Sequence, residues 1–468
     1  MKTRTDSRQK AQLTINGNTL RKAVAWALDA KIFAHLKFHG NTSWAVFDLV
    51  SLAIVWVWSD KATLTGAFTE ARQWSTQVLK HAAVGTYQGL LKALVRWTPS
   101  LLPLMWERLQ RLMEENGKSH WRVGHWLALA VDGSRISTPR TQANEKAFCA
   151  ANFGKSNTAK YRAKKRRAKG VQQRSKKSEP IKPQIWTTLL WHMGLQMPWS
   201  WKLGPSNSSE RDHFQTVLRE QKFPKNTLFC ADAGFTGYEL WKAIIEGGHS
   251  FLIRVGANVK LLRQLGYYVR EHDGIVYCWP DKVARGQRPP LVLRLFCLQV
   301  GKCQMSLLSN IIDDNQLTDH QAIRLYRLRW GVELQFRTVK QTFGRRKLRS
   351  HTPERALVEL DWSLMGLWLI QLFAVKEQIE IGEIPEKCSV GLAIQIIREM
   401  MQNASASSEL TLGEKLSVAQ KDSYRRKGSK KARYKPKYKD KPTAGHPKVV
   451  KATRGHKMRL REYLETLN

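Results

Sequence analysis

HWLALAVDG, at residues 125–133, is a short apolar run that ends in an acid and a glycine. Short apolar runs broken by Gly and Pro are typical of buried β-strands. The same texture recurs in QIWTTLLWHMGLQMPWSWKLG at 184–204, TLFCADAGF at 227–235 and SFLIRVG at 250–256. The first of these three predicts an antiparallel pair that turns near Gly194, and segments of helical character at 206–221 and 238–246 separate the later strands. This order of elements predicts a mixed α/β sheet.

The segments on either side of this sheet differ in character. Residues 1–118 have the apolar spacing of helices and predict an all-helical N-terminal domain. Strand-like segments after 257 (IVYCWP, LVLRLFCLQV and CQMSLLS) predict a β-rich insertion. We therefore expect a helical domain at 1–118, a first part of the core at 119–256, the insertion at 257–316, a helix and the rest of the core at 317–380, a helical region at 381–423 and a basic tail at 424–468.

The chain carries a large excess of positive charge. Its 468 residues hold 78 Lys and Arg against 38 Asp and Glu, which gives a formal net charge of +40. Such an excess favours a polyanionic partner, and nucleic acid is the simplest. Two runs of sequence concentrate the positive charge. The first is residues 160–177, within a loop predicted at about 155–183, and the second is residues 424–459. Both predict disordered basic segments that bind DNA without regard to its sequence.

Several other classes of protein fit the sequence poorly. The longest apolar run, 44–58, is shorter than the roughly 18 residues that span a bilayer, so it predicts a buried helix and no membrane partner. The first residues lack the apolar stretch of a signal peptide, and the six cysteines show no zinc spacing. We therefore expect a cytoplasmic protein with reduced, metal-free thiols. HExxH, GxSxG and a complete phosphate loop are absent.

LTDHQAIRLYRLRWGVELQFRTVKQTF, at 317–343, predicts an amphipathic helix that begins with a capping box of Thr318 and Gln321. An arc of about 60° beside its apolar stripe holds four polar residues, Tyr326, Arg329, Glu333 and Lys340. Arg337 lies roughly 20° further on. The simpler interpretation is a solvated face in which Arg329 and Glu333, an i,i+4 pair, stabilise the helix by a few tenths of a kcal/mol.

Two acids elsewhere favour a functional interpretation of that helix. Asp132 and Asp232 each follow an apolar run, so each is predicted at the C-terminal tip of a strand. Taken alone, each would be an ordinary turn or helix-cap aspartate. With Glu333 they make an oxygen-only set suited to Mg²⁺ or Mn²⁺. Two such ions about 4 Å apart can activate a water or a 3′-hydroxyl for in-line attack on a phosphodiester, while Tyr, Arg and Lys side chains hold phosphate oxygens.

The spacing Tyr326-x2-Arg329-x3-Glu333-x6-Lys340 resembles the Y-(2)-R-(3)-E-(6)-K signature of bacterial insertion-sequence transposases in the insertion-sequence-four family, a branch of the DDE class. AVDGS around Asp132 looks like the first acidic motif of that family, and CADAGFTGYE around Asp232 looks like the second. The resemblance covers roughly residues 120–380.

This resemblance implies a ribonuclease-H-like core with a β-rich insertion. Its catalytic residues would be Asp132, Asp232 and Glu333, which would also hold two Mg²⁺ or Mn²⁺ ions. Tyr326, Arg329 and Lys340 would bind DNA near the cut, and Arg337 is grouped with them. The enzyme would excise its element and join the 3′ ends to double-stranded target DNA, acting as a homodimer in the bacterial cytoplasm at the nucleoid. Trp279 or Trp330 could stack on a flipped base, and the sequence does not choose between them.

Two other hypotheses stay open at the level of sequence. One is a non-catalytic remnant of a mobile element, kept for its basic DNA- or RNA-binding surface. The other is a structure-specific nuclease of the same fold, which would cut DNA and never join the product to a second duplex.

Overall fold

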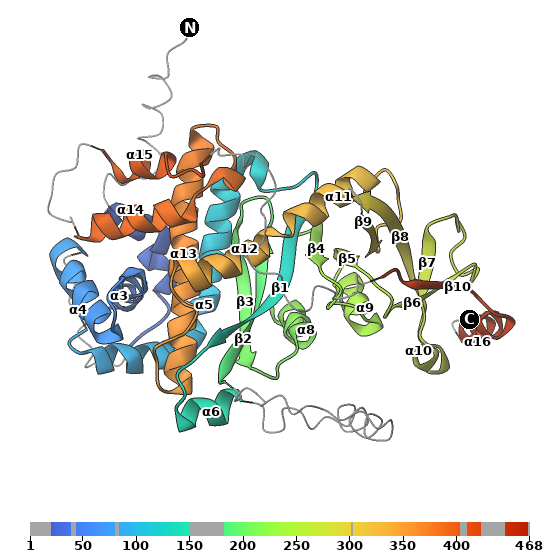
Figure 1. Cartoon of the computed structure of the whole chain (residues 1–468), viewed down its shortest axis with the longest axis horizontal. Helices are drawn as coiled ribbons and strands as arrows, with labels where there is room; N and C mark the ends of the chain where they lie inside the picture. The colour runs from blue at the N-terminus through green and yellow to red at the C-terminus, as the bar shows by residue number, and fades with distance from the viewer. Residues whose placement is uncertain are drawn as a thin grey trace, which may run out of the picture.

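A ten-stranded mixed sheet runs through the part of the chain that the computed structural model describes, which is residues 20–38, 44–79, 84–149, 182–300, 303–402, 410–422 and 445–466. The strand order is β10-β6-β7-β8-β9-β5-β4-β1-β2-β3. Helices gather at one end of the molecule, and the β6 to β8 strands extend to the other (Figure 1). The predicted mixed α/β class is confirmed.

The strands of the predicted core lie side by side in one half of the sheet. They are β1 (Leu127–Ser137), β2 (Gln184–His192), β3 (Met197–Pro205), β4 (Thr227–Ala231) and β5 (Ser250–Arg254). β1, β4 and β5 are parallel, whereas β2 is antiparallel to both β1 and β3. The predicted hairpin turns between β2 and β3, where a Cβ on Gly194 would lie 2.1 Å from the carbonyl oxygen of His120. Only glycine fits such a close backbone approach.

The predicted insertion continues the same sheet. Its strands are β6 (Lys260–Arg263), β7 (Ile275–Cys278), β8 (Leu291–Val300) and β9 (Cys303–Ser309), with the short helix α10 (Asp281–Arg285). β9 is antiparallel to β5, with Leu252 opposite Ser309 and Arg254 opposite Leu307. The insertion is therefore joined to the core by a hydrogen-bonded ladder.

The prediction of a disordered tail is wrong for residues 445–466. β10 (Lys448–Lys451) pairs parallel with β6, and α16 (Arg454–Glu465) follows it. The β-branched pair Val449 and Val450 favours the strand, and Leu460 and Tyr463 bury one side of the helix. Residues 424–444, the basic run 160–177 and residues 1–19 lie outside the described residues.

Helices pack beside the core half of the sheet. The N-terminal set is α2 (Leu20–Leu28), η1 (Ala30–Phe33), α3 (Val46–Trp58), α4 (Leu64–Trp74), η2 (Ser75–Leu79), α5 (Tyr87–Gly117) and η3 (Lys118–His120). The later set is α13 (Pro353–Glu380), η5 (Pro385–Lys387), α14 (Val390–Gln402) and α15 (Leu412–Ser417). α13 contacts α3, α5, α14 and α15 (Figure 1). The apolar run that predicted a buried helix is α3, whose residues are nearly all buried.

α13 also packs on the sheet, and it is the only described helix long and apolar enough to cross a membrane. Because 94% of its apolar window is buried inside the protein, it has the surroundings of a core helix. Shorter helices flank the strands: α6 (Gln142–Phe148), α8 (Glu210–Glu220) and α9 (Tyr238–Glu246).

A buried acid on α13 makes stability depend on pH. The indole nitrogen of Trp201 in β3 donates to Asp361 Oδ1 at 2.7 Å, and burial raises the pKa of Asp361 to about 7. Because the folded protein holds this proton more tightly than the unfolded chain does, stability falls as pH rises between about 4 and 7. Asp361→Asn keeps an acceptor oxygen for Trp201, and we expect its melting temperature to exceed that of the wild type by a few degrees at about pH 8.

Melting curves between about pH 5 and pH 8 test this expectation. Asp273→Asn, which neutralises an exposed acid, is the matched control and should leave the pH dependence unchanged. Equal pH slopes for Asp361→Asn and the wild type would contradict the assignment.

Candidate active site

The predicted helix at 317–343 is broken into three pieces. α11 (Asp319–Leu328) starts with the predicted capping box of Thr318 and Gln321, α12 (Gly331–Arg337) follows, and a π-helical turn, η4 (Thr338–Thr342), ends the segment. The break falls at Arg329 and Trp330, just before Gly331 packs on the indole ring of Trp191 in β2. The prediction of a helix was correct, but its continuity was wrong because packing on β2 redirects the chain.

Register in the sheet brings the two aspartates together. Val131 of β1 lies opposite Ala231, the last residue of β4, so Asp132 and Asp232 are the next residues of two adjacent parallel strands. Asp232 ends its strand as predicted. The prediction that Asp132 does so is wrong, because β1 continues to Ser137 along β2. Its neighbour β4 ends first, so Asp132 has no strand beside it on that side.

Glu333 on α12 lies close to this pair, and α12 contacts β1. Burial, with a smaller contribution from the negative charges of Asp232 and Glu333, raises the pKa of Asp132 to about 7. Three acids from distant parts of the chain therefore share one electrostatic environment. Within the described residues, however, no three Asp, Glu, His or Cys side chains are arranged to hold one metal ion.

Arg329 has unused donors in this environment. It is 6% exposed, and its Nη2 donates to Glu333 Oε1 at 2.9 Å. Its Nε and Nη1 are buried and have no hydrogen-bond partner among the described residues. A buried guanidinium with free donors is a binding group for an oxyanion, since unpaired buried donors are unfavourable.

Tyr326 and Lys340 also face this region. The Arg329 guanidinium lies 5.1 Å from the centre of the Tyr326 ring, and burial raises the pKa of the Tyr326 hydroxyl. Lys340 Nζ donates to the hydroxyl of Ser134, two residues beyond Asp132, at 2.6 Å. The positive charge of Lys340 is therefore held against β1, beside the acids.

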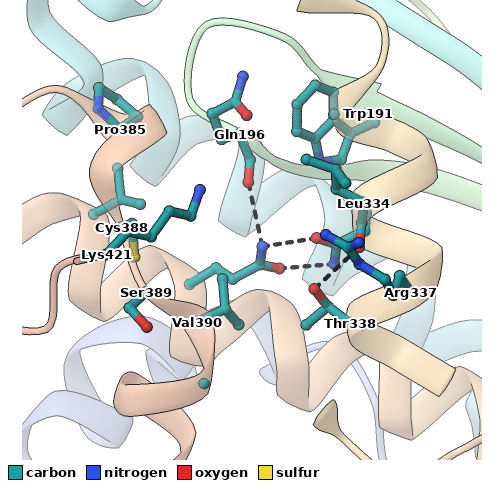
Figure 2. A pocket seen from close by; sticks show the side chains of 15 residues that line it. Trp191, Gln196, Leu334, Arg337, Thr338, Pro385, Cys388, Ser389, Val390 and Lys421 are labelled. Atoms are coloured by element: carbon teal, nitrogen blue, oxygen red, sulfur yellow. Dashed lines mark hydrogen bonds between the residues drawn. The ribbon is translucent and has the colours of Figure 1, made fainter. Parts of the chain in front are cut away.

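The structure places Arg337 differently. Its side chain is exposed and lines a cavity of about 190 Å³ that also contains Lys421 and the amide pair of Gln335 and Gln371 (Figure 2). Figure 2 shows Arg337 on the α12 side of this cavity and Lys421 across it. Arg337 thus lines the cavity together with Leu334 and Gln335 of α12. Glu333 is not among the residues that line this cavity.

Two charged residues near the acids were missed by the sequence analysis. Arg254 ends β5, level with Asp232 because Ala231 lies opposite Ile253, and its positive charge opposes the burial that raises the pKa of Tyr326. The sequence analysis selected Asp232 because it is a polar residue at the end of a predicted strand, and the same criterion could have identified Arg254. Glu210, the first residue of α8, lies near Asp232. Acids are common in the first turn of a helix, so nothing in the sequence distinguished Glu210 from an ordinary helix-start residue.

The carboxylate of Glu210 is wedged between two glycines that follow the aspartates. A Cβ on Gly133 would lie 2.6 Å from Glu210 Oε2, and a Cβ on Gly234 would lie 2.6 Å from Glu210 Oε1. The absence of side chains at Gly133 and Gly234 therefore admits a fourth acid beside the site.

Comparison with protein-family models identifies one family. The family model described as "Transposase DDE domain" matches residues 127–369, just over half of the chain. The transposase InsG for insertion sequence element IS4 of Escherichia coli (strain K12) is 24% identical over 299 residues, and the match covers 61% of each chain. The chain thus matches about three fifths of the length of this curated relative. A solved synaptic complex of piggyBac transposase with hairpin DNA is similar at a TM-score of 0.39 and 11% identity, over 91% of this chain and 88% of that one.

Proposed function

The chain belongs to the DDE transposase family, and from this premise we propose that it cuts the ends of an insertion sequence and joins the 3′ ends to target DNA by metal-dependent phosphoryl transfer. The resemblance to insertion-sequence-four transposases is confirmed by the family match and by the IS4 relative. We also propose a ribonuclease-H-like core, as that resemblance implies. Parallel β1, β4 and β5 with an antiparallel hairpin on one side support it.

One observation carries the proposal. Asp132, Asp232 and Glu333 lie far apart in the sequence, yet the charges of Asp232 and Glu333 raise the pKa of Asp132. The buried side chain of Arg329, which has two donor nitrogens without a hydrogen-bond partner among the described residues, lies beside them. The guanidinium is suited to bind the oxygens of a phosphodiester, and the neighbouring carboxylates are suited to bind a cation.

The chemistry of the three acids, rather than their present arrangement, fits divalent metal ions. Asp132, Asp232 and Glu333 would hold Mg²⁺ or Mn²⁺, because all three offer hard carboxylate oxygens and because their mutual repulsion is relieved by a cation. Two bound ions would supply an activated water or 3′-hydroxyl and would neutralise charge on the leaving oxygen.

The remaining residues act on the DNA. Arg329 would offer a planar fork of donors to the scissile phosphate, and the Tyr326 hydroxyl, whose ring packs on that guanidinium, would reach the same region. Lys340 holds a compact charge beside β1. For a flipped base, Trp330 is the better candidate of the two tryptophans, because it is 55% exposed next to Arg329 whereas Trp279 is 3% exposed and donates its indole N–H to the Arg288 carbonyl. As partners we propose double-stranded DNA and a second copy of the chain, in the bacterial cytoplasm.

The test is an assay for both cutting and joining. Purified protein with Mg²⁺ is incubated with supercoiled plasmid that carries the element's own flanking sequences, and a second labelled duplex is added as target. We expect cleavage that needs the metal, followed by covalent joining of 3′ ends to the target. Cleavage without joining would favour a structure-specific nuclease, and binding without cleavage would favour a non-catalytic remnant; either result contradicts the proposal.

Arg329→Lys separates phosphate recognition from charge. Lysine keeps the positive charge beside Glu333 but loses the planar fork, so we expect cleavage to fall by roughly 10²-fold. The matched control is Arg327→Lys, an exposed arginine on the same helix, which should cleave like the wild type. Equal cleavage by the two variants would remove Arg329 from the site.

A further inference from the structure

Two glutamine side chains join α12, the helix that carries Glu333, to the core helix α13. Gln335 Nε2 donates to Gln371 Oε1 at 2.9 Å, and Gln371 Nε2 donates back to Gln335 Oε1 at 2.8 Å. Gln371 Nε2 also donates to the backbone carbonyl of Gln196 at 3.2 Å. Figure 2 draws these three hydrogen bonds as dashed lines. α12, α13 and the turn between β2 and β3 thus meet at one amide pair.

The amide pair is buried in apolar surroundings. Gln335 is 4% exposed and Gln371 is 2% exposed. Gln335 shares the buried side of α12 with Val332 and Phe336, and Gln371 lies in the apolar stretch of α13. Burying an amide is unfavourable unless its polar atoms are paired, and two apolar side chains would fill the same space without that requirement. Burial alone therefore does not account for two glutamines at this contact.

α12 is too short to hold its orientation by continuity with a long helix. It has 7 residues, the chain breaks from α11 at Arg329 and Trp330, and a π-helical turn follows it. The rotation of α12 about its own axis is therefore set by the groups on which it packs. Apolar contacts are non-directional, whereas a pair of amide hydrogen bonds has a preferred distance and angle.

Glu333 lies across α12 from the amide pair. Glu333 and Gln335 are neighbours but one in the sequence, which at about 100° per residue places them roughly 160° apart around the helix. A carboxylate about 5–6 Å from the helix axis moves by ~1 Å when the helix turns by about 10°. A displacement of ~1 Å in a catalytic group can lower the rate about 10²-fold. The rotation fixed on the buried side therefore decides where the Glu333 carboxylate lies.

We propose that Gln335 and Gln371 are positioning residues for Glu333, because their amide pair fixes the rotation of α12 about its axis. This inference rests on the proposed function and adds to it two residues that act through Glu333 and not on the DNA themselves. Any other rotation of α12 leaves buried amide groups unpaired, and such groups are costly inside a protein. The pair thus selects one orientation of the helix.

The simpler explanation is that the amide pair only stabilises the fold. The two explanations differ for a variant that keeps the packing and loses the direction. Methionine is unbranched like glutamine, adapts to the space around it and has a similar helix propensity. Gln335→Met combined with Gln371→Met in the full chain therefore replaces the amide pair by an apolar contact.

We expect this double variant to melt at or above the wild-type temperature, because removing both polar partners leaves no unpaired amide between the helices. The Gln196 carbonyl borders the cavity of about 190 Å³ and stays accessible to water. Hydrogen exchange of the α12 amides should nevertheless be several-fold faster, and cleavage in Mg²⁺ should fall by about 10-fold or more. Each single variant should also lose cleavage, and it should melt lower because it leaves one buried amide unpaired.

Gln378→Met is the matched control. Gln378 is a buried glutamine about two turns further along α13, and it donates to the carbonyls of Leu416 and Ala419. Its loss should lower the melting temperature. Measured well below that temperature, exchange in α12 and cleavage should match the wild type. The control also shows what a loss of stability alone does to cleavage, should the double variant melt lower than expected.

Wild-type cleavage by the double variant overturns the proposal. A loss of cleavage in Gln378→Met equal to that of the double variant also overturns it, because the effect would then follow stability rather than direction. Unchanged exchange in α12 overturns it on a readout that is independent of activity. Failure of the proposed function would be seen differently, as no cleavage by the wild type, and exchange would still report whether the amide pair fixes α12.

Discussion

We expect Asp132→Asn, Asp232→Asn and Glu333→Gln each to abolish strand cleavage in Mg²⁺, with a loss of about 10³-fold or more, because under the proposed function each removes one charge that would hold the metal ions at the reacting phosphate. The amides keep the shape of the side chains. They also relieve repulsion, since burial and the charges of Asp232 and Glu333 raise the pKa of Asp132 to about 7. We therefore expect all three proteins to fold.

A readout independent of activity comes from melting curves. Without metal at about pH 8, Asp132→Asn should melt at or above the wild-type temperature, because an acid with a raised pKa destabilises the folded protein once pH passes that pKa. Added Mg²⁺ or Mn²⁺ should raise the melting temperature of the wild type and have a smaller effect on the three amide variants.

The matched control is Asp212→Asn, which neutralises an exposed acid on the same turn of α8 as Glu210. It should cleave and respond to metal like the wild type. Retained cleavage in any amide variant excludes that residue from the catalytic set, and an unchanged metal response in all three argues against their binding the ions.

Gly331→Ala should disable the site through packing alone. A Cβ at this position would lie 1.8 Å from the Cη2 atom of Trp191, whose side chain is 2% exposed. Both Trp191 and Gly331 border the cavity of about 190 Å³, so we expect the clash to be relieved by a shift of the Trp191 ring together with a displacement of α12 that carries Glu333 with it. Overpacking of this kind destabilises by about 1–3 kcal/mol, and a displacement of ~1 Å in a catalytic group can lower the rate about 10²-fold.

Two comparisons make this result specific. Gly391→Ala in the first turn of α14, where the nearest atom to an added Cβ is Thr342 Cγ2 at 3.5 Å, should be neutral or slightly stabilising. Adding Trp191→Leu to Gly331→Ala should restore part of the cleavage, because the smaller side chain makes room for the new methyl group. Wild-type melting and cleavage in Gly331→Ala would show that α12 tolerates the shift.

Local sequence patterns predicted the strands and helices of the core, because the apolar runs and the helical periodicity are strong local signals. They also singled out Asp132, Asp232 and Glu333, whose charges act on one another in the structure, but they grouped Arg337 with them although it lines a separate cavity. They did not predict that β1 runs past Asp132, because only the pairing with β2 sets where that strand stops. The break at Arg329 and Trp330 has the same origin, in a contact between Gly331 and a tryptophan 140 positions earlier.

The tail and Glu210 show a second limit. Charge dominated the composition of residues 424–459, and it concealed the four-residue strand and the two apolar residues that dock α16. Glu210 looked like any acid that begins a helix, and only the three-dimensional proximity of Gly133 and Gly234 makes it part of the site.

The ladder between β9 and β5 has a mechanical consequence. Since Arg254 is opposite Leu307 in that ladder and its positive charge acts on Tyr326, a shift of β9 along the ladder would move Arg254 and change the surroundings of the Tyr326 hydroxyl.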